Sequence, residues 1–251
     1  MMKTEWDYTE LADAYLQRPE YANDVLETMF QIAALKPGDH VCDIGAGVAH
    51  LTIPMAKKGF QVDAVEPNDA MRANGIARTK DLPNVVWSEG TGEATGCLTA
   101  NYDFVTFGSS FNVCDRTLAL KETYRLLKPN KWFACLWNHR DLEDTIQAHI
   151  EDIIKKNIPN YTYGTRREDQ SEIIKASNLF HDIRPVTGQV KHLSHIDTVI
   201  EAWRSHATLH RQAGDKFPMI IRSISEYLHQ LGQDTITIPY TTHAWMAQRK
   251  S

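Results

Sequence analysis

Short apolar segments alternate with helical segments along residues 41–137, and this alternation constrains the fold more than any other feature of the chain. The apolar segments span residues 41–44, 62–65, 85–87, 104–107 and 132–137. Segments with helical character cover residues 49–58, 69–78 and 117–127. Strands that are joined by helices in this order form right-handed βαβ units. The sequence therefore predicts an α/β fold with a parallel sheet that has helices on both faces.

The flanking regions predict additional elements. Residues 9–30 read as one or two helices with a break at Pro19. Apolar residues at helical spacing follow the alternating region at 146–154, 196–203 and 217–231, and two late strands are predicted at 185–193 and 234–246. Residues 157–170 lack periodicity and are predicted to form a long loop. Loops of this length are often functional, so this one is a candidate for a functional role.

No segment resembles a linker, so we expect residues 1–251 to form a single domain. Its expected parts are a helical lid (1–35), a cofactor-binding core (36–140), and a region with helical additions and the last two strands (141–251).

Composition excludes several function classes. The 251 residues are 42% hydrophobic and 24% charged, which is typical of a soluble globular protein. No apolar run suits a membrane span, and the N-terminus does not resemble a secretory signal. The four cysteines are dispersed, so no disulfide framework is predicted and a cytoplasmic location is expected. The eleven histidines are not clustered, so no metal site is predicted. The chain has 27 basic and 32 acidic side chains, and this balance favours a small-molecule substrate over nucleic acid or membrane. We expect a monomer or a homodimer.

The most informative motif is a glycine-rich turn between a predicted buried strand and a helix. Asp43 precedes Gly45, Ala46 and Gly47. The two glycines let a ligand approach the backbone. A dinucleotide fingerprint needs a third glycine at the position of His50, and the Asp43 carboxylate would repel a pyrophosphate. The same carboxylate suits a ligand that carries a cationic amino group.

Two further segments are predicted at the same edge of the sheet. Glu66 ends the second strand about 20 residues after the turn, where a carboxylate can accept both ribose hydroxyls. The loop Glu89–Ala94 follows the third strand and could border an adenine ring. Ligands of open parallel sheets bind along this edge.

The ordered set of motifs resembles the class I S-adenosylmethionine-dependent methyltransferases, and within them the small-molecule group that resembles trans-aconitate methyltransferase-like proteins. The matching motifs are D-I-G-A-G at 43–47, Glu66, G-T-G-E at 90–93, the strand 103–112, L-L-K-P-N at 126–130 and W-N-H-R-D at 137–141. The resemblance implies a Rossmann-like, seven-stranded, mostly parallel sheet with an antiparallel C-terminal strand pair, and N-terminal and inserted helices over the active site. Ala49 stands where the family's first motif has a third glycine, and we expect the helix start to tolerate it.

The resemblance also implies the cofactor, S-adenosylmethionine, and its product, S-adenosylhomocysteine. Asp43 would hold the methionine amino group, Glu66 the ribose, and Arg18 the methionine carboxylate. The complete set of implied cofactor-binding residues is Tyr8, Arg18, Asp43, Gly45, Ala46, Gly47, Glu66, Pro67, Asn68, Met71, Thr91, Gly92, Glu93, Phe107 and Gly108.

Acceptor-side residues carry weaker signals. Candidates for substrate binding are Tyr15, Ser109, Asn138, Arg140, Tyr163, Arg166, Trp203 and His206, although core packing is the simpler interpretation of Trp203. Asn112 and His139 are the catalytic candidates, Asn112 to position the acceptor and His139 as a base with a suitable ordinary pKa. Adjacent strand residues point to opposite faces, so His139 and Arg140 line one site only if the strand ends there.

The sequence thus predicts methyl transfer from S-adenosylmethionine to an oxygen or nitrogen of a small-molecule metabolite. Methylation of carbon on a quinone- or sterol-like acceptor is an alternative. A nucleotide-binding oxidoreductase and a non-catalytic cofactor-binding subunit are the alternatives from other classes.

Overall fold

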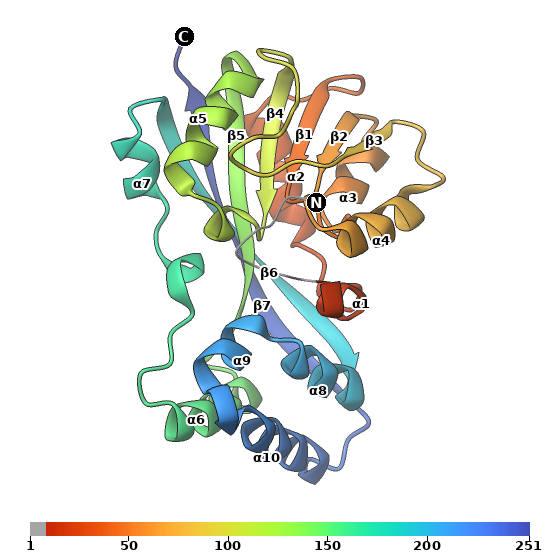
Figure 1. Ribbon diagram of the computed structural model, residues 1–251, viewed down its shortest axis with the longest axis vertical. Coiled ribbons are helices and arrows are strands. Elements are labelled where there is room, and N and C mark those ends of the chain that lie inside the picture. The colour runs from red at the N-terminus through yellow and green to blue at the C-terminus, as the bar shows by residue number, and fades with distance from the viewer. Residues whose placement is uncertain (1–8) are drawn as a thin grey trace.

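Seven strands form one sheet in the order β3-β2-β1-β4-β5-β7-β6 in the computed structural model, which describes residues 9–251 (Figure 1). The strands are β1 (His40–Ile44), β2 (Gln61–Val65), β3 (Val85–Ser88), β4 (Tyr102–Gly108), β5 (Leu127–Arg140), β6 (Phe180–His195) and β7 (Thr235–Arg249). Strands β1 to β5 are parallel, and β7 runs antiparallel to both β5 and β6. The predicted sheet, including its antiparallel C-terminal pair, is confirmed.

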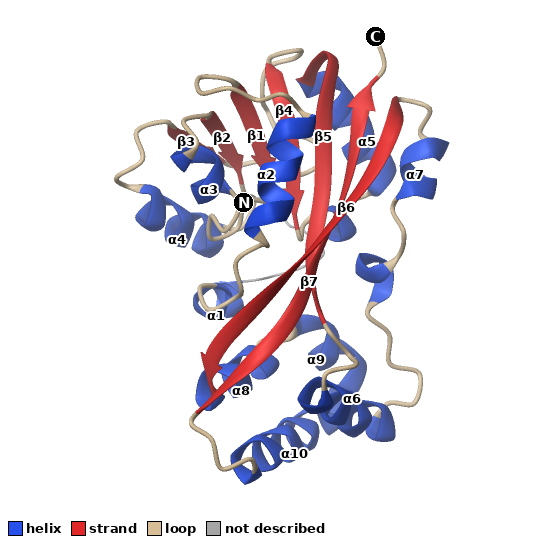
Figure 2. Ribbon diagram, turned by 180° about the vertical axis from the view of Figure 1, so that it is seen from behind, coloured by secondary structure: helices blue, strands red, loops and turns tan. Residues whose placement is uncertain are grey.

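Ten α-helices are present in the described part of the chain. They are α1 (Ala12–Tyr15), α2 (Asn23–Ile32), α3 (Thr52–Lys57), α4 (Asp69–Thr79), α5 (Arg116–Leu126), α6 (Thr145–Asn157), α7 (Ser171–Ala176), α8 (Ile196–Arg204), α9 (Ala207–Ala213) and α10 (Phe217–Gln230). Short 3-10 helices occur at Thr9–Leu11, Phe111–Val113, Gly164–Arg167 and Gly214–Lys216. Helices α2 and α3 cover one face of the sheet and α5 covers the other, as the front and rear views show (Figures 1 and 2).

Side-chain alternation along the strands explains these two layers. Val41 packs with α2 and α3, whereas its neighbour Cys42 packs with α5, and both are fully buried. A parallel strand covered on both faces has few polar positions. This burial is why the central strands could be recognised from short continuous apolar runs.

Strands β6 and β7 extend well beyond the parallel part of the sheet. They pair continuously from Val186↔Ala244 to His195↔Thr235, and their far ends carry α6, α8, α9 and α10 (Figure 2). We call these four helices and the adjoining strand ends the helical lobe. Ile150, Trp203, Ile224 and Leu228 are fully or almost fully buried in its own apolar core. The helical spacing of apolar residues predicted three of the four helices.

The structure differs from the sequence prediction at several element ends. Strand β5 begins at Leu127 and not at the predicted residue 132, and the added part contains an irregularity where the register with β4 shifts and Asn130 adopts a φ of 61°. The helix expected from about Ala49 begins at Thr52, and Ala49 itself has a φ of 73°. Left-handed backbone costs about 1–2 kcal/mol for a residue with a Cβ atom. Ala49 is therefore tolerated in a strained turn and not at a helix start.

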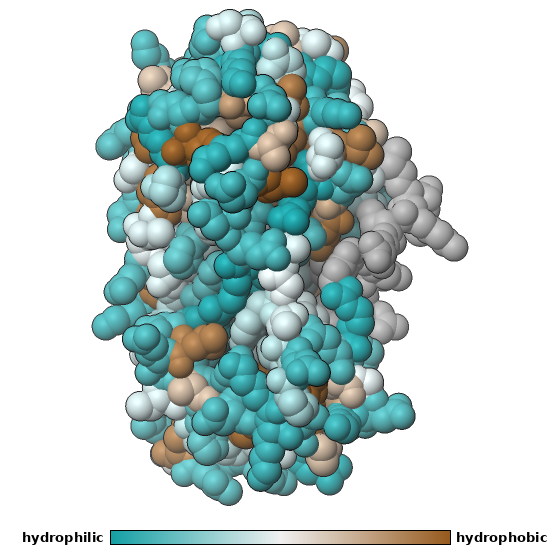
Figure 3. All heavy atoms as spheres, turned by 90° about the vertical axis from the view of Figure 1, so that its left-hand side faces the viewer, coloured by the Kyte–Doolittle hydropathy of each residue, from teal (hydrophilic) through white to brown (hydrophobic). Residues whose placement is uncertain are grey.

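Large exposed hydrophobic residues are scattered over the described surface. They are Ile76, Val86, Leu98, Leu118, Leu193 and Met219, which come from separate elements. On the face in Figure 3, hydrophobic side chains are likewise interspersed with hydrophilic ones. Among the described residues, no helix combines the length and apolar character that a membrane span requires.

Candidate active site

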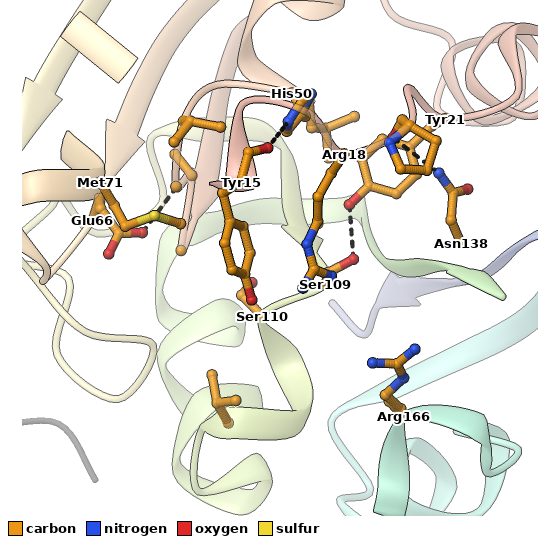
Figure 4. A pocket seen from close by; sticks show the side chains of 18 of the residues that line it. Tyr15, Arg18, Tyr21, His50, Glu66, Met71, Ser109, Ser110, Asn138 and Arg166 are labelled. Atoms are coloured by element: carbon orange, nitrogen blue, oxygen red, sulfur yellow. Dashed lines mark hydrogen bonds between the residues drawn. The ribbon is translucent and has the colours of Figure 1, made fainter. Parts of the chain in front are cut away.

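A single pocket extends from the carboxyl ends of β1, β2 and β4 to the helical lobe. Its lining includes Asp43 and Glu66 at the sheet, Arg18 from the segment after α1, and Arg166 and His206 at the lobe. Figure 4 shows Glu66, Arg18 and Arg166 around one space, with Arg18 and Arg166 reaching into it from opposite sides. The topology places the pocket where open parallel sheets bind ligands.

The glycine-rich turn forms the sheet side of the pocket. Gly45 and Gly47 adopt φ values of 67° and 56°, which glycine reaches without strain. The amide groups of Gly45 and Ala46 both donate to the Val65 carbonyl, at 2.8 and 3.0 Å. A Cβ atom on Gly45 would lie 2.4 Å from the Cβ atom of Ser110. Glycine is therefore required at position 45 for both backbone conformation and space.

Two threonine hydroxyls fix the Asp43 carboxylate. Thr52 donates to Oδ2 at 2.7 Å, and Thr106 donates to Oδ1 at 2.9 Å. Burial raises the pKa of Asp43 to about 6, which the two hydrogen bonds partly oppose. No cation neutralises this carboxylate within the described residues. The site thus presents a buried negative charge that a ligand ammonium group would compensate.

Glu66 holds the second strand end against the glycine turn. Its Oε2 atom accepts from the Gly47 amide at 2.8 Å, and Oε1 accepts from the Asn68 amide at 2.9 Å. Burial raises the pKa of Glu66, while the two amide hydrogen bonds act in the opposite direction. Asn68 caps α4 by accepting from the Met71 amide at 3.0 Å. The Glu66 carboxylate and the Met71 thioether consequently share one wall of the pocket (Figure 4).

A loop after β3 closes this end of the pocket. Thr91 and Ala94 exchange backbone hydrogen bonds of 3.1 and 3.2 Å, and the Glu93 carboxylate accepts from the Asp115 amide at 2.6 Å. Gly92 approaches Cys114 so closely that a Cβ atom would lie 2.4 Å from its sulfur. The loop is therefore fixed to the start of α5.

The segment between α1 and α2 crosses the pocket beside the end of β4. The Tyr21 hydroxyl lies 3.0 Å from the Ser109 hydroxyl, and the Arg18 guanidinium stacks 4.0 Å from the Tyr15 ring centre. Asn138 ties this segment to β5 by donating to the carbonyls of Pro19 and Glu20, at 3.2 and 2.9 Å. The expected break near Pro19 thus lets the chain pass over the pocket.

Arginine and histidine side chains define the lobe side. Arg140 lies 4.2 Å above the Trp203 ring, and Trp203 in turn stacks on His206 with ring centres 5.2 Å apart. His206 Nδ1 accepts from the Leu209 amide and so caps α9, whereas the buried Nε2 atom has no hydrogen-bond partner among the described residues. Burial and the nearby arginines hold the pKa of His206 well below its usual range, so its ring is neutral at pH 7.

The pocket brings together nineteen of the residues that the sequence singled out. They are Tyr15, Arg18, Asp43, Gly45, Ala46, Gly47, Glu66, Pro67, Asn68, Met71, Thr91, Gly92, Glu93, Gly108, Ser109, Asn138, Arg140, Arg166 and His206. Tyr8 lies outside the described residues.

The structure corrects the positions expected for Asn112 and His139, because neither lines the pocket. Asn112 accepts a hydrogen bond of 2.8 Å from the Trp137 indole. His139 is buried on the opposite side of β5 and bonds the Arg166 carbonyl at 2.9 Å. Burial and then the Arg167 charge lower the pKa of His139 to about 3. A general-base role for His139 therefore lacks both access and basicity.

Three further candidates lie behind the pocket wall. Phe107 is completely buried among the residues between the sheet and α5. Trp203 is buried in the core of the lobe, which agrees with its simpler interpretation as a core residue, and it contacts the pocket residue Arg140. The Tyr163 hydroxyl donates to Glu151 at 2.5 Å and does not line the pocket.

Several lining residues had no sequence signal. Tyr21 and His50 come from the N-terminal crossing segment and the glycine turn, and His192, Thr198 and Tyr240 come from the lobe. The lobe residues depend on how β6 and β7 place α8 against the sheet, which no local pattern encodes.

Comparison with known proteins gives the family of the core. Residues 42–135 match the family model described as "Methyltransferase domain". The matched range is less than half of the chain, and over this range the chain resembles a methyltransferase domain. The matched range contains most of β1 and β5 and all of β2 to β4, and so contains the glycine turn and Glu66.

Two curated relatives resemble the chain over part of its length. An uncharacterized methyltransferase of Schizosaccharomyces pombe is 31% identical over 138 residues, covering 53% of this chain and 52% of the relative. The ubiquinone/menaquinone biosynthesis C-methyltransferase UbiE of Rubrivivax gelatinosus is 33% identical over 109 residues, covering 42% of each chain. The chain therefore matches about half the length of these relatives.

A solved structure shares the fold over almost the whole chain. Phosphoethanolamine N-methyltransferase 2 of Haemonchus contortus, solved with phosphomonomethylethanolamine and S-adenosylhomocysteine, aligns with a TM-score of 0.58 at 16% identity. The alignment covers 97% of this chain and 58% of that one. At this identity the likeness establishes the methyltransferase fold of the present chain.

Proposed function

We propose that this protein transfers a methyl group from S-adenosylmethionine to an oxygen or nitrogen atom of a small-molecule acceptor. The observation that carries the proposal is the continuity of the pocket. One space is lined by the strand-end carboxylates of Asp43 and Glu66 and, at its other end, by His206 from the helical lobe and Arg166 from the 3-10 helix Gly164–Arg167. A donor and an acceptor can therefore lie against each other in the same enclosure.

The residues at the sheet end fit S-adenosylmethionine. Asp43 offers a buried, unneutralised carboxylate to the methionine ammonium group, and Glu66 offers acceptor atoms to the ribose hydroxyls. Asn68 and Met71 would flank the adenine, with Thr91 to Glu93 at its edge. Arg18 is the fixed cation for the methionine carboxylate.

The bound donor supplies an electrophilic methyl group, so the protein's main contribution is alignment of the acceptor. Tyr21 and Ser109 stand at the end of β4 and can orient an acceptor atom through their linked hydroxyl groups. Burial raises the pKa of Tyr21, so its hydroxyl stays protonated and acts as a hydrogen-bond donor. Because Nδ1 of the neutral His206 ring accepts from the Leu209 amide, the proton lies on Nε2, and this unpartnered N–H can donate a hydrogen bond to the acceptor.

The same proposal assigns roles to the parts of the chain. Residues 1–35 act as a lid, residues 36–140 hold the donor, and residues 141–251 complete the acceptor side within a single domain. The motif set favours a relationship to the trans-aconitate methyltransferase-like group. The similarity to UbiE favours carbon methylation as the second candidate, although three arginines make this pocket a poor match for a quinone.

Calorimetry and methyl-group labelling test the proposal together. We expect S-adenosylhomocysteine to bind the purified protein, and label from S-adenosylmethionine to enter a small-molecule fraction of a metabolite extract. Glu66→Ala should weaken donor binding by about 1–3 kcal/mol, because a hydrogen bond to a charged group is lost. Glu27→Gln is the control, since Glu27 pairs with Lys58 and neither residue lines the pocket. Absence of binding heat in the wild-type protein would refute the proposal.

A further inference from the structure

Three guanidinium groups share the pocket without a neutralising partner. Arg18, Arg140 and Arg166 all line it. Within residues 9–251, none of the three forms an ion pair with a carboxylate, and none of their side chains donates a hydrogen bond. The Nε atoms of Arg140 and Arg166 are buried and lack partners among these residues. A buried cation without a partner is costly, so such a cluster calls for a negatively charged ligand.

The surrounding structure orients these groups without neutralising them. Arg140 is held over the rings of Trp203 and Tyr240, at 4.2 and 5.8 Å. Arg166 belongs to the 3-10 helix Gly164–Arg167, and the His139 ring bonds its carbonyl oxygen. Aromatic faces and backbone hydrogen bonds fix the positions but leave the guanidinium donors available.

Two carboxylates from this part of the chain have other partners. Glu151 accepts from the Tyr163 hydroxyl and pairs with Lys155 at 3.1 Å. Asp141, which follows Arg140 in the chain, accepts from the Glu143 amide at 3.0 Å. Neither carboxylate therefore satisfies the arginine groups of the pocket.

The mutual effect of the arginines supports the same conclusion. Burial and then the charges of Arg18 and Arg140 lower the pKa of Arg166 to about 10. The guanidinium remains charged at neutral pH, but in a repulsive environment. His206 and His192 face the cluster as neutral rings and add no negative charge.

We propose that Arg140 and Arg166 form an anion-binding subsite for the acceptor, which carries a carboxylate or phosphate group and is anchored by it. This inference rests on the proposed methyltransferase function, with Arg18 reserved for the methionine carboxylate. Two guanidinium groups at one end of the pocket fix the acceptor's charged end, which leaves its nucleophilic atom to extend toward Tyr21 and Ser109. Bidentate recognition of this kind suits planar carboxylates and phosphates.

A binding experiment tests the subsite directly on the S-adenosylhomocysteine-saturated protein. Succinate and inorganic phosphate serve as anionic probes, and succinamide serves as the neutral match for succinate. We expect the anions to bind at least tenfold more tightly than succinamide, and Arg166→Gln and Arg140→Gln each to weaken anion binding at least tenfold. Arg166→Lys should retain part of the affinity. Arg184→Gln, at an exposed arginine paired with Asp182, should have no effect.

The three variants and the control are also compared for their affinity for S-adenosylhomocysteine, which should change less than twofold. This comparison separates the subsite from the fold and from the donor site. Equal binding of succinate and succinamide, or equal anion affinity in the wild-type and Arg166→Gln proteins, would overturn the anion subsite.

Labelling then distinguishes the subsite from the proposed function. A metabolite extract is divided on an anion-exchange column before incubation with labelled S-adenosylmethionine. We expect the methyl label to enter compounds from the retained, anionic fraction. Label that enters only the unretained fraction refutes the anionic acceptor while leaving the methyltransferase function intact. Failure of the wild-type protein to bind S-adenosylhomocysteine refutes both.

Discussion

The two ends of the pocket are built in different ways. At the sheet end, Asp43 and Glu66 are each held by two hydrogen bonds from residues of the sheet and its connecting turns. At the lobe end, Arg140 rests on aromatic rings and Arg166 belongs to a loop segment. The difference indicates that the donor end is a property of the architecture of the sheet, whereas the acceptor end depends on how the helical lobe packs.

The largest effect should come from opening the core of the helical lobe. Ile224 is completely buried there, so Ile224→Ala should destabilise the protein by about 2–5 kcal/mol through lost packing and a cavity. Met219→Ala, on the same helix at a 48% exposed position, is the control and should cost under about 0.5 kcal/mol. Urea unfolding checks both variants. A single shifted transition would show that lobe and sheet unfold together, and a separate early transition would show that the lobe is independent.

The next largest effect should come from the glycine turn at the sheet end. Gly45→Ala combines left-handed backbone with a clash against Ser110, so we expect a loss of about 3 kcal/mol in the free energy of unfolding. Gly47→Ala has similar backbone strain, but its Cβ would meet the flexible end of Met71 at 3.2 Å. It should therefore cost about 1–2 kcal/mol. Equal losses in the two variants would contradict the packing argument for Gly45.

Predictability from sequence follows the same division between the two ends. The parallel strands were predictable because strands buried on both faces leave short continuous apolar runs, such as Trp132 to Trp137. The glycine turn and Glu66 were predictable because backbone conformation and position at a strand end restrict the residue type. These are local requirements, and local requirements are visible in a sequence.

The lobe end required information that is not local. Much of β6 has alternately exposed residues, so its full extent from Phe180 to His195 exceeded the predicted strand. His192 and Tyr240 reach the pocket only because β6 and β7 pair far beyond the parallel sheet. His139 was misplaced because β5 continues through Arg140, which turns adjacent side chains to opposite sides. Because Asn138 and Arg140 point toward the pocket, the alternation of side chains along β5 turns His139 away from it.

A substitution at His139 tests that conclusion through the pH dependence of stability. The folded-state pKa of about 3 lies below the ordinary value of 6.5, so only the unfolded state gains this proton on mild acidification. His139 therefore contributes stability above pH 6.5 that is lost as the pH falls. Between pH 7.5 and pH 5, wild-type protein should lose about 2 kcal/mol more than His139→Phe, measured by urea unfolding. Parallel losses in the two proteins would mean that His139 is accessible to protons when folded.

The smallest effect concerns the charge of Asp43, and its measurement distinguishes the contribution of Asp43 from that of the other residues at the donor end. Its pKa is raised to about 6, so the carboxylate gains its charge as the pH rises from 5 to 7. If this charge pairs with the ligand ammonium group, affinity for S-adenosylhomocysteine should rise about tenfold over that interval, or about 1.4 kcal/mol. Calorimetry at several pH values measures the rise, which Asp43→Asn should largely remove. Adenosine is the matched ligand, because it keeps the ribose contacts of Glu66 but lacks the amino-acid part and its ammonium group. An equal rise for adenosine would assign the pH dependence to Glu66 and would remove the ammonium role from Asp43.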